Sequence, residues 1–204
     1  DCAIADQIRS TSFAERLRFN SRTVTDSRSN LIVKDTFLQG FPYTGQVSQH
    51  DVQQPGGSPT ISQTSTTYQT LTLGTGIEQR KFPYASSSTD KHWEVEGVQN
   101  GNQIDEVVTT TLVDTYGTAY DVTTTRTEKT AANGVQPSAT YTQRTLWPTA
   151  NLVNNTTNWC LGRPGKVQQI QSHSQYSGTS ITRTTDFTWD TTLCRPTQAV
   201  VEPA

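Results

Sequence analysis

Several residue types are scarce in this chain. It has no methionine and only three cysteines and three histidines among its 204 residues. Hydrophobic residues make up 31% of it, whereas roughly 45–50% is typical of globular domains. No apolar run approaches the roughly 20 residues that a membrane-spanning helix needs. The composition therefore excludes a thick hydrophobic core and predicts that this segment does not insert into a membrane.

The chain also lacks a large excess of positive or negative charge. The 16 basic residues are scattered among 18 acidic ones, for a net charge of -2. A surface that binds phosphates needs clustered Lys and Arg, so we expect no nucleic-acid partner. Low hydrophobicity can indicate disorder, but disordered chains usually combine it with high net charge and few β-formers. Here Thr, Val, Tyr and Trp recur throughout, which favours β-structure.

The residue patterns of common active sites are absent from the sequence. There is no Gly-x-Ser-x-Gly, P-loop or Gly-x-Gly-x-x-Gly segment. The histidines, His50, His92 and His173, lie in polar stretches without a partner pattern, and we expect them at the surface or in turns. No Cys/His cluster has the spacing of a zinc site. We therefore expect no enzymatic activity, no metal and no cofactor.

The cysteines do not form a regular framework. Cys2, Cys160 and Cys194 are odd in number and irregularly spaced, which is not typical of a disulfide-rich fold. Cys160 and Cys194 could form a bridge if their hairpins are neighbours. We favour the alternative of unpaired thiols that are buried or at a sheet edge.

Turn-forming residues recur along the whole chain, and β-branched residues fill the intervals. Residues 106–113 (EVVTTTLV) and 121–127 (DVTTTRT) are two such intervals. Gly, Pro, Asn, Asp and Ser clusters mark the turns between them, and residues 86–90 (SSSTD) are one of the predicted turns. This succession predicts an all-β fold, a meander of antiparallel β-hairpins that forms a curved sheet.

Two segments near the C-terminus carry the most specific pattern. Residues 156–163 (TTNWCLGR) suggest an aromatic anchor, a glycine turn and an outgoing strand; their motif residues are Trp159, Leu161, Gly162 and Arg163. Residues 182–190 (TRTTDFTWD) form a strand pattern that ends in Trp189 and Asp190.

A similar strand end occurs earlier, at Val113-Asp114-Thr115-Tyr116-Gly117. An Asp at this place can accept hydrogen bonds from the backbone N–H groups of its own turn. The Gly117 that follows can take the left-handed conformation. The aromatic or apolar residue before the Asp would cover the neighbouring hairpin.

These segments resemble the repeat of the Rhs/YD-repeat family, whose units carry a Tyr-Asp turn and often a Trp-x-Leu-Gly-Arg segment. Val113 and Trp189 stand where the family has Tyr, and Leu193 stands at the Gly position after Asp190. Upstream, Phe41-Pro42-Tyr43 and its echo Phe82-Pro83-Tyr84 mark predicted strand boundaries. The first of them resembles segments of large Rhs-type proteins related to the B component of bacterial toxin complexes.

The resemblance implies a structural role. The family builds a long strip of β-hairpins that coils into a hollow shell around a C-terminal toxin segment. Residues 1–204 would then be a single β-repeat region, a section of the wall in a longer, secreted or cell-surface bacterial protein. Its partners would be the remainder of the parent shell protein and the enclosed toxin. The self-cleaving and toxic parts would lie beyond residue 204.

The first residues are less regular, and residues 1–18 are expected to be an irregular lead-in. Residues 12–19 (SFAERLRF) offer an N-cap and place Phe13 and Leu17 at helical spacing. The resemblance nevertheless favours a strand entry over a helix there.

A second class of function remains open, a surface-exposed carbohydrate-binding or adhesive β-module. Its candidate glycan contacts are Trp93 and Trp147. We favour the alternative that the Trp side chains pack between adjacent hairpins. We also expect edge-to-edge self-association, because unpaired strand edges recruit partners.

Overall fold

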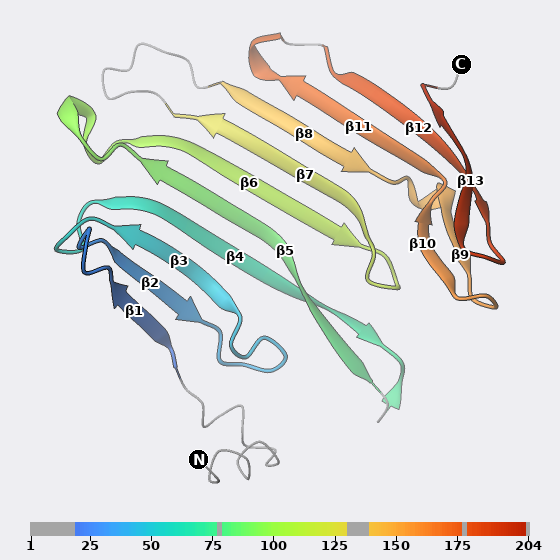
Figure 1. Cartoon of the computed structure of the whole chain (residues 1–204), viewed down its shortest axis with the longest axis horizontal. Helices are drawn as coiled ribbons and strands as arrows, with labels where there is room; N and C mark the ends of the chain where they lie inside the picture. The colour runs from blue at the N-terminus through green and yellow to red at the C-terminus, as the bar shows by residue number, and fades with distance from the viewer. Residues whose placement is uncertain (1–18, 77–78, 130–138, 177–178, 203–204) are drawn as a thin grey trace.

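One large antiparallel sheet dominates the protein (Figure 1). The computed structural model describes residues 19–76, 79–129, 139–176 and 179–202. The chain is 64% strand and 5% helical, and its 11-stranded sheet does not close into a barrel. The prediction of an all-β meander is therefore confirmed. The expected lead-in at residues 1–18 and the alternatives for residues 12–18 lie outside the described residues.

The strands follow the chain across the sheet, and a hairpin of β9 and β10 is inserted between β8 and β11. The bounds are β1 Ser21–Thr25, β2 Ile32–Phe37, β3 Val47–Gln53, β4 Thr60–Leu73, β5 Arg80–Trp93, β6 Gln103–Val113, β7 Ala119–Glu128, β8 Thr140–Leu146, β9 Leu152–Asn155, β10 Cys160–Pro164, β11 Lys166–His173, β12 Ile181–Asp190 and β13 Arg195–Val201. Short 3-10 helices occupy Gly97–Gln99, Thr149–Asn151 and Ser174–Tyr176. The predicted strands at residues 106–113 and 121–127 lie within β6 and β7.

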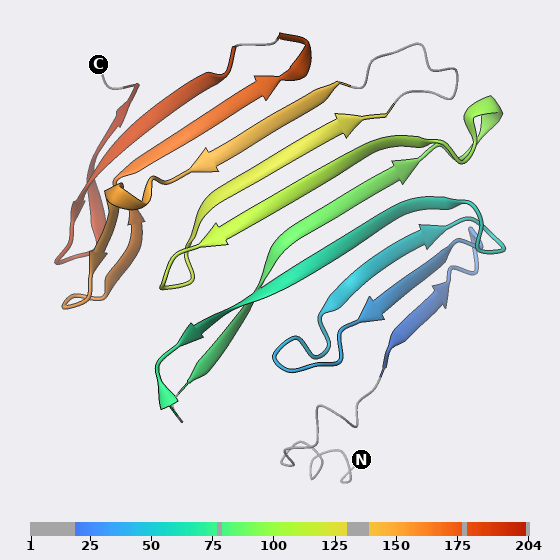
Figure 2. The same ribbon diagram turned by 180° about the vertical axis from the view of Figure 1, so that it is seen from behind.

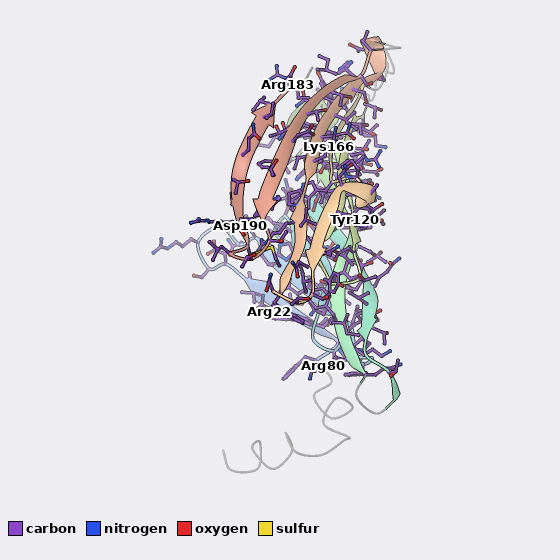
Figure 3. All side chains as sticks on the ribbon, turned by 90° about the vertical axis from the view of Figure 1, so that its right-hand side faces the viewer. Arg22, Arg80, Tyr120, Lys166, Arg183 and Asp190 are labelled. Atoms are coloured by element: carbon purple, nitrogen blue, oxygen red, sulfur yellow. A yellow bond between two sulfur atoms is a disulfide. The ribbon has the colours of Figure 1, made fainter. Side chains whose placement is uncertain are left out.

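The sheet is a single, curved layer when it is viewed along its edge (Figure 3). In the described part of the chain, only Ala139 and Cys160 are buried apolar residues. The reason lies in the strand sequences, which place Thr, Ser and Gln on both faces. Thr109 and Thr124 face each other across β6 and β7, and their hydroxyl oxygens are 3.2 Å apart. Such β-branched, hydroxyl-bearing pairs stabilise a sheet that has water on both sides.

The two outer strands leave their edges open. β1 and β13 flank the sheet at opposite sides, as the view from behind also shows (Figure 2). Every residue of both strands is exposed. Within the residues that the structure describes, no further strand pairs with either edge.

Two predicted strand boundaries are wrong. Residues 86–90 lie in the middle of β5, where Ser87 pairs with Thr67 of β4 and Thr110 of β6. A serine cluster predicts a turn only if the strands must have an apolar face. The strands of this sheet carry polar residues on both faces, so a serine cluster can lie within one of them. Pro83 also lies within β5, in the part that extends beyond β6. A proline is tolerated there because, in the described part of the chain, no second strand pairs with this segment and needs its missing N–H donor.

Candidate functional site

The side chains that this sheet buries are mainly carboxylates. Asp35, Asp51, Asp105 and Asp121 expose only 3%, 5%, 6% and 9% of their surface, respectively. They lie on β2, β3, β6 and β7, with Asp35 and Asp105 on one face of the sheet and Asp51 and Asp121 on the other, and we call this set the carboxylate row. A buried carboxylate is costly unless it is paired and hydrogen-bonded. The partners of each member therefore determine what the row can do.

Asp35 is held between a cation and an imidazole from the two flanking strands. Arg22 on β1 and His50 on β3 both stand directly opposite it in the ladder. Arg22 Nε donates to Asp35 Oδ2 at 3.0 Å, and His50 Nδ1 lies 2.6 Å from Asp35 Oδ1. The hydrogen bond with His50, helped by Arg22, lowers the pKa of Asp35 below its ordinary value, although burial acts in the opposite direction.

The same arrangement recurs at Asp105, on the same face of the sheet. His92 Nδ1 of β5 lies 2.6 Å from Asp105 Oδ1, and Arg126 of β7 lies 2.9 Å from Oδ2. The register connects the two sites, since His50 pairs with Thr64 and Thr64 pairs with Asp90. Asp90 is two residues before His92, so both histidines project from one face.

The other two carboxylates use different partners. Arg144 of β8 forms two hydrogen bonds to Asp121, at 2.9 and 2.6 Å, and this pairing raises the pKa of Arg144. Asp51 accepts amide hydrogens from Gln49 at 2.8 Å and from Gln63 at 2.9 Å. Three of the four carboxylates thus bind a guanidinium, and all four are linked to a neighbouring strand.

These contacts join strands, and the sequence did not reveal them. Among the described residues, the His50 ring has one hydrogen-bond partner, Asp35, and the His92 ring has one, Asp105. The structure also shows no group of three or more metal-ligating side chains in its described ranges. His92 is exposed and His50 is half-buried, in line with the expected surface position, but both lie within strands and not in turns. Only the strand register, which a lone sequence does not fix, brings each histidine to its carboxylate.

The turn between β6 and β7 has the geometry that its sequence predicts. Asp114 Oδ1 accepts backbone N–H groups of Tyr116 and Thr118, both at 2.8 Å. Gly117 has a φ of 84°. The carboxylate therefore caps its own turn, and the glycine supplies the left-handed step.

Three other hairpins use the same device without a glycine. Each begins with an Asp or Asn whose side-chain oxygen accepts a turn N–H, and each ends with a left-handed residue four positions later. The pairs are Asp26 with Asn30, Asn155 with Trp159, and Asp190 with Cys194. The turn N–H of Arg28 and the hydroxyl of Ser29 lower the pKa of Asp26. The sequence interpretation identified the turn residue Asp190 and placed turns at residues 26–30 and 149–158, but it gave no capping role to Asp26 or Asn155.

A disulfide between Cys160 and Cys194 fixes the β9–β10 hairpin to the sheet, and we call this junction the clamp. Cys160, which is wholly buried, is bonded to Cys194 in the turn between β12 and β13. The preference for unpaired thiols at these two positions is therefore wrong. Their 34-residue separation concealed the contact, because only the inserted hairpin brings them together. Cys2 lies outside the described residues.

Gly162 is part of a bulge in β10 and not of a turn. The register between β10 and β9 shifts between Cys160 and Arg163, and Gly162 has a φ of 62°. Its N–H donates to Asn154 Oδ1 at 2.7 Å. A Cβ atom at this position would overlap the Thr118 hydroxyl of the β6–β7 turn. The motif glycine thus permits close packing of the clamped hairpin on the sheet.

The other motif residues meet across the same junction. Trp189 Nε1 donates to the carbonyl oxygen of Pro164 at 2.8 Å. The Arg163 guanidinium lies 5.8 Å from the centre of the Trp189 ring, within cation–π range. Arg163 Nε also lies 3.4 Å from Cys194 Sγ. The structure therefore brings Arg163, Gly162 and Trp189 together at the clamp.

The motif position of Trp159 suggested that its ring packs between hairpins, but it does not. It exposes 78% of its surface, because it is the left-handed last residue of the β9–β10 turn, with a φ of 55°. Trp93 and Trp147, the candidate glycan contacts, are both partly buried. Trp159 instead lines a groove, together with Leu161.

Comparisons with protein-family models and with curated proteins found no match to this sequence. Within the described residues, no helix has the length and apolar character to cross a bilayer. The function must therefore be argued from the sheet, its edges and the clamp.

Proposed function

We propose that this chain is a structural, non-enzymatic β-strip. It would form one section of the wall of a hollow shell of the Rhs/YD-repeat kind, which encloses a C-terminal toxin segment. The observation that carries the proposal is the open, single-layered sheet with polar side chains on both faces and two edges that no described strand covers. The resemblance of the 156–163 and 182–190 segments is a second support.

The physical requirements of a wall match these residues. A wall one strand thick must tolerate water on both faces, so it cannot rely on a hydrophobic core. The carboxylate row and the threonine pairs stabilise the sheet from strand to strand instead. A wall must also continue on both sides, and exposed edge strands such as β1 and β13 can accept further strands. The partners would be the remainder of the parent shell protein and its enclosed segment.

The disulfide supports a location outside the cytosol. Disulfides form and persist in oxidising compartments and are rare in reducing ones. The Cys160–Cys194 bridge holds an entire hairpin in place. A secreted or cell-surface bacterial protein is the location that we propose on this ground.

Light scattering over a range of concentrations tests the proposed wall section. We expect the isolated chain to self-associate through its edges. Val24→Lys on β1 and Val200→Lys on β13 should each reduce association, since edge lysines block strand pairing. Thr75→Lys, in the exposed β4–β5 turn, is the matched control and should leave association unchanged.

A chain that stays monomeric at all concentrations, with β1 and β13 protected from hydrogen exchange, would contradict the proposal. Electron microscopy of the proposed full-length parent protein provides the second test. The expected image is a hollow particle with these strands in its wall. A solid or extended particle would reject the enclosing role.

A further inference from the structure

A groove of about 680 Å³ opens where three hairpins end close together. The end of the β4–β5 hairpin contributes Arg80, which Figure 3 shows at the extremity of the sheet. The β6–β7 turn contributes Tyr116, and the β9–β10 hairpin contributes Trp159 and Arg163. The groove is therefore lined by two aromatic residues and two arginines.

The aromatic rings are exposed but held by a fixed backbone. Trp159 is the residue before Cys160, which is wholly buried in the disulfide. A left-handed backbone is uncommon for a bulky residue and points to a constrained turn. Tyr116 is held in the turn that Asp114 caps, and its ring is also exposed. The groove is thus built before any ligand arrives, which lowers the entropic cost of binding.

Among the described residues that line the groove, the charged ones are both arginines. Arg80 and Arg163 are both exposed. Among the described residues, no acidic side chain forms an ion pair with either of them. A guanidinium binds a carboxylate through two parallel hydrogen bonds, so the groove is complementary to a ligand that carries carboxylates.

The form of the groove favours a carbohydrate over a peptide. A peptide would gain most from adding a strand to the free edge of β5 beside the groove. That edge carries Pro83, which has no N–H group to offer. Flat Trp and Tyr rings, by contrast, match the apolar faces of sugar rings. The exposed ring of Trp159 and the Tyr116 ring provide two such surfaces.

We infer that this groove binds an anionic carbohydrate that carries carboxylates, such as a uronic-acid oligomer. Trp159 and Tyr116 stack on its sugar rings, and Arg80 and Arg163 bind its carboxylates. The site differs from Trp93 and Trp147, and it does not depend on the proposed wall function.

Isothermal titration with a galacturonic acid tetramer tests this inference. We expect saturable binding that weakens with added salt, because exposed charges are screened. Trp159→Ala and Arg80→Gln should each raise the dissociation constant at least about tenfold, because each removes one contact with the ligand. Arg28→Gln, an exposed arginine in the β1–β2 turn, is the matched control and should bind as the wild type does.

Two further ligands separate the chemistry. The methyl-esterified tetramer keeps the sugar rings without the charges and should bind at least about tenfold more weakly. Polyglutamate keeps the charges without the rings and should also bind more weakly. Equal binding of polyglutamate would assign the groove to an acidic peptide and overturn the inference. Absence of binding of the galacturonate tetramer, or unchanged binding by both variants, would overturn it as well.

Discussion

His50 Nδ1 and Asp35 Oδ1 lie 2.6 Å apart across β3 and β2. His92 and Asp105 repeat this pair at the same distance across β5 and β6, and in each case an arginine binds the second carboxylate oxygen. In other proteins an oriented imidazole of this kind can act as a base. Here both pairs lie on one face of a thin sheet, and each pair, together with its arginine, connects three successive strands.

Removal of the Asp35 carboxylate should destabilise the protein. Asp35→Ala leaves Arg22 and His50 without their shared acceptor, and we expect a loss of about 1–3 kcal/mol in the free energy of unfolding. Lys34→Ala is the matched control, since Lys34 is the exposed neighbour on the same strand. It should change the free energy by no more than about 0.5 kcal/mol. Urea unfolding measures both, and an equal effect of the two variants would deny Asp35 its role.

Acid should remove this stabilisation in a defined range. The pKa of Asp35 is lowered in the folded protein from an ordinary value of 3.8. Its contribution is therefore fully present above about pH 4 and lost as the pH falls through the folded-state pKa. The difference in unfolding free energy between the wild type and Asp35→Asn should shrink as the pH falls from about 5 to about 2, a range that includes the ordinary pKa of an aspartate. A difference that stays constant over this range would contradict the assignment.

Reduction of the disulfide should loosen the β9–β10 hairpin. We expect Cys194→Ser to lower the free energy of unfolding by about 2–4 kcal/mol, as is typical when a bridge is removed. Hydrogen exchange should accelerate most in β9 and β10, which pair with each other and not with the main sheet. Peptide mapping under non-reducing conditions should recover Cys160 joined to Cys194. A bridge that instead involves Cys2 would contradict the structure.

Gly162→Ala should cost more than a positive φ alone explains. The new methyl group would overlap the Thr118 hydroxyl, and overpacking of this kind costs about 1–3 kcal/mol. Gly56→Ala is the matched control, because Gly56 has a φ of 87° and no atom within 4 Å of the added Cβ. Thr118→Gly should recover part of the loss in the Gly162→Ala background. If both alanine variants lose the same stability, the close approach to Thr118 is unimportant.

Trp159 and Trp189 should respond differently to truncation. Trp159 is exposed, so Trp159→Ala should change the free energy of unfolding by no more than about 0.5 kcal/mol. Trp189 is partly buried and donates to Pro164 at the clamp. Trp189→Phe removes this hydrogen bond and should cost about 0.5–1.5 kcal/mol. Thermal unfolding compares the two variants, and a larger effect at Trp159 would mean that its ring is covered in solution.

The sequence predicted the fold class because turns and β-branched segments are local signals. The capped turn at Asp114 and Gly117 was predicted for the same reason, since all of its contacts lie within five residues.

The paired histidines could not be predicted, because their partners are set by register. His50 and Asp35 are 15 residues apart, and a slip of one residue would place them on opposite faces. Trp159 was misjudged for a related reason. The expectation of a packed aromatic assumed that the hairpin buries its turn, whereas the disulfide buries Cys160 and turns the neighbouring ring outward.

The order of the strands has a consequence for how the protein comes apart. Within the described residues, each inner strand of the main sheet pairs only with its two neighbours and each edge strand with one. Stability is therefore close to a sum of local interfaces, as in linear repeat proteins. Unfolding can then begin at a free end and proceed strand by strand. The disulfide fastens the β12–β13 end, while β1 has no such crosslink among the described residues. Under force or denaturant the strip should therefore unzip from β1 toward the clamp.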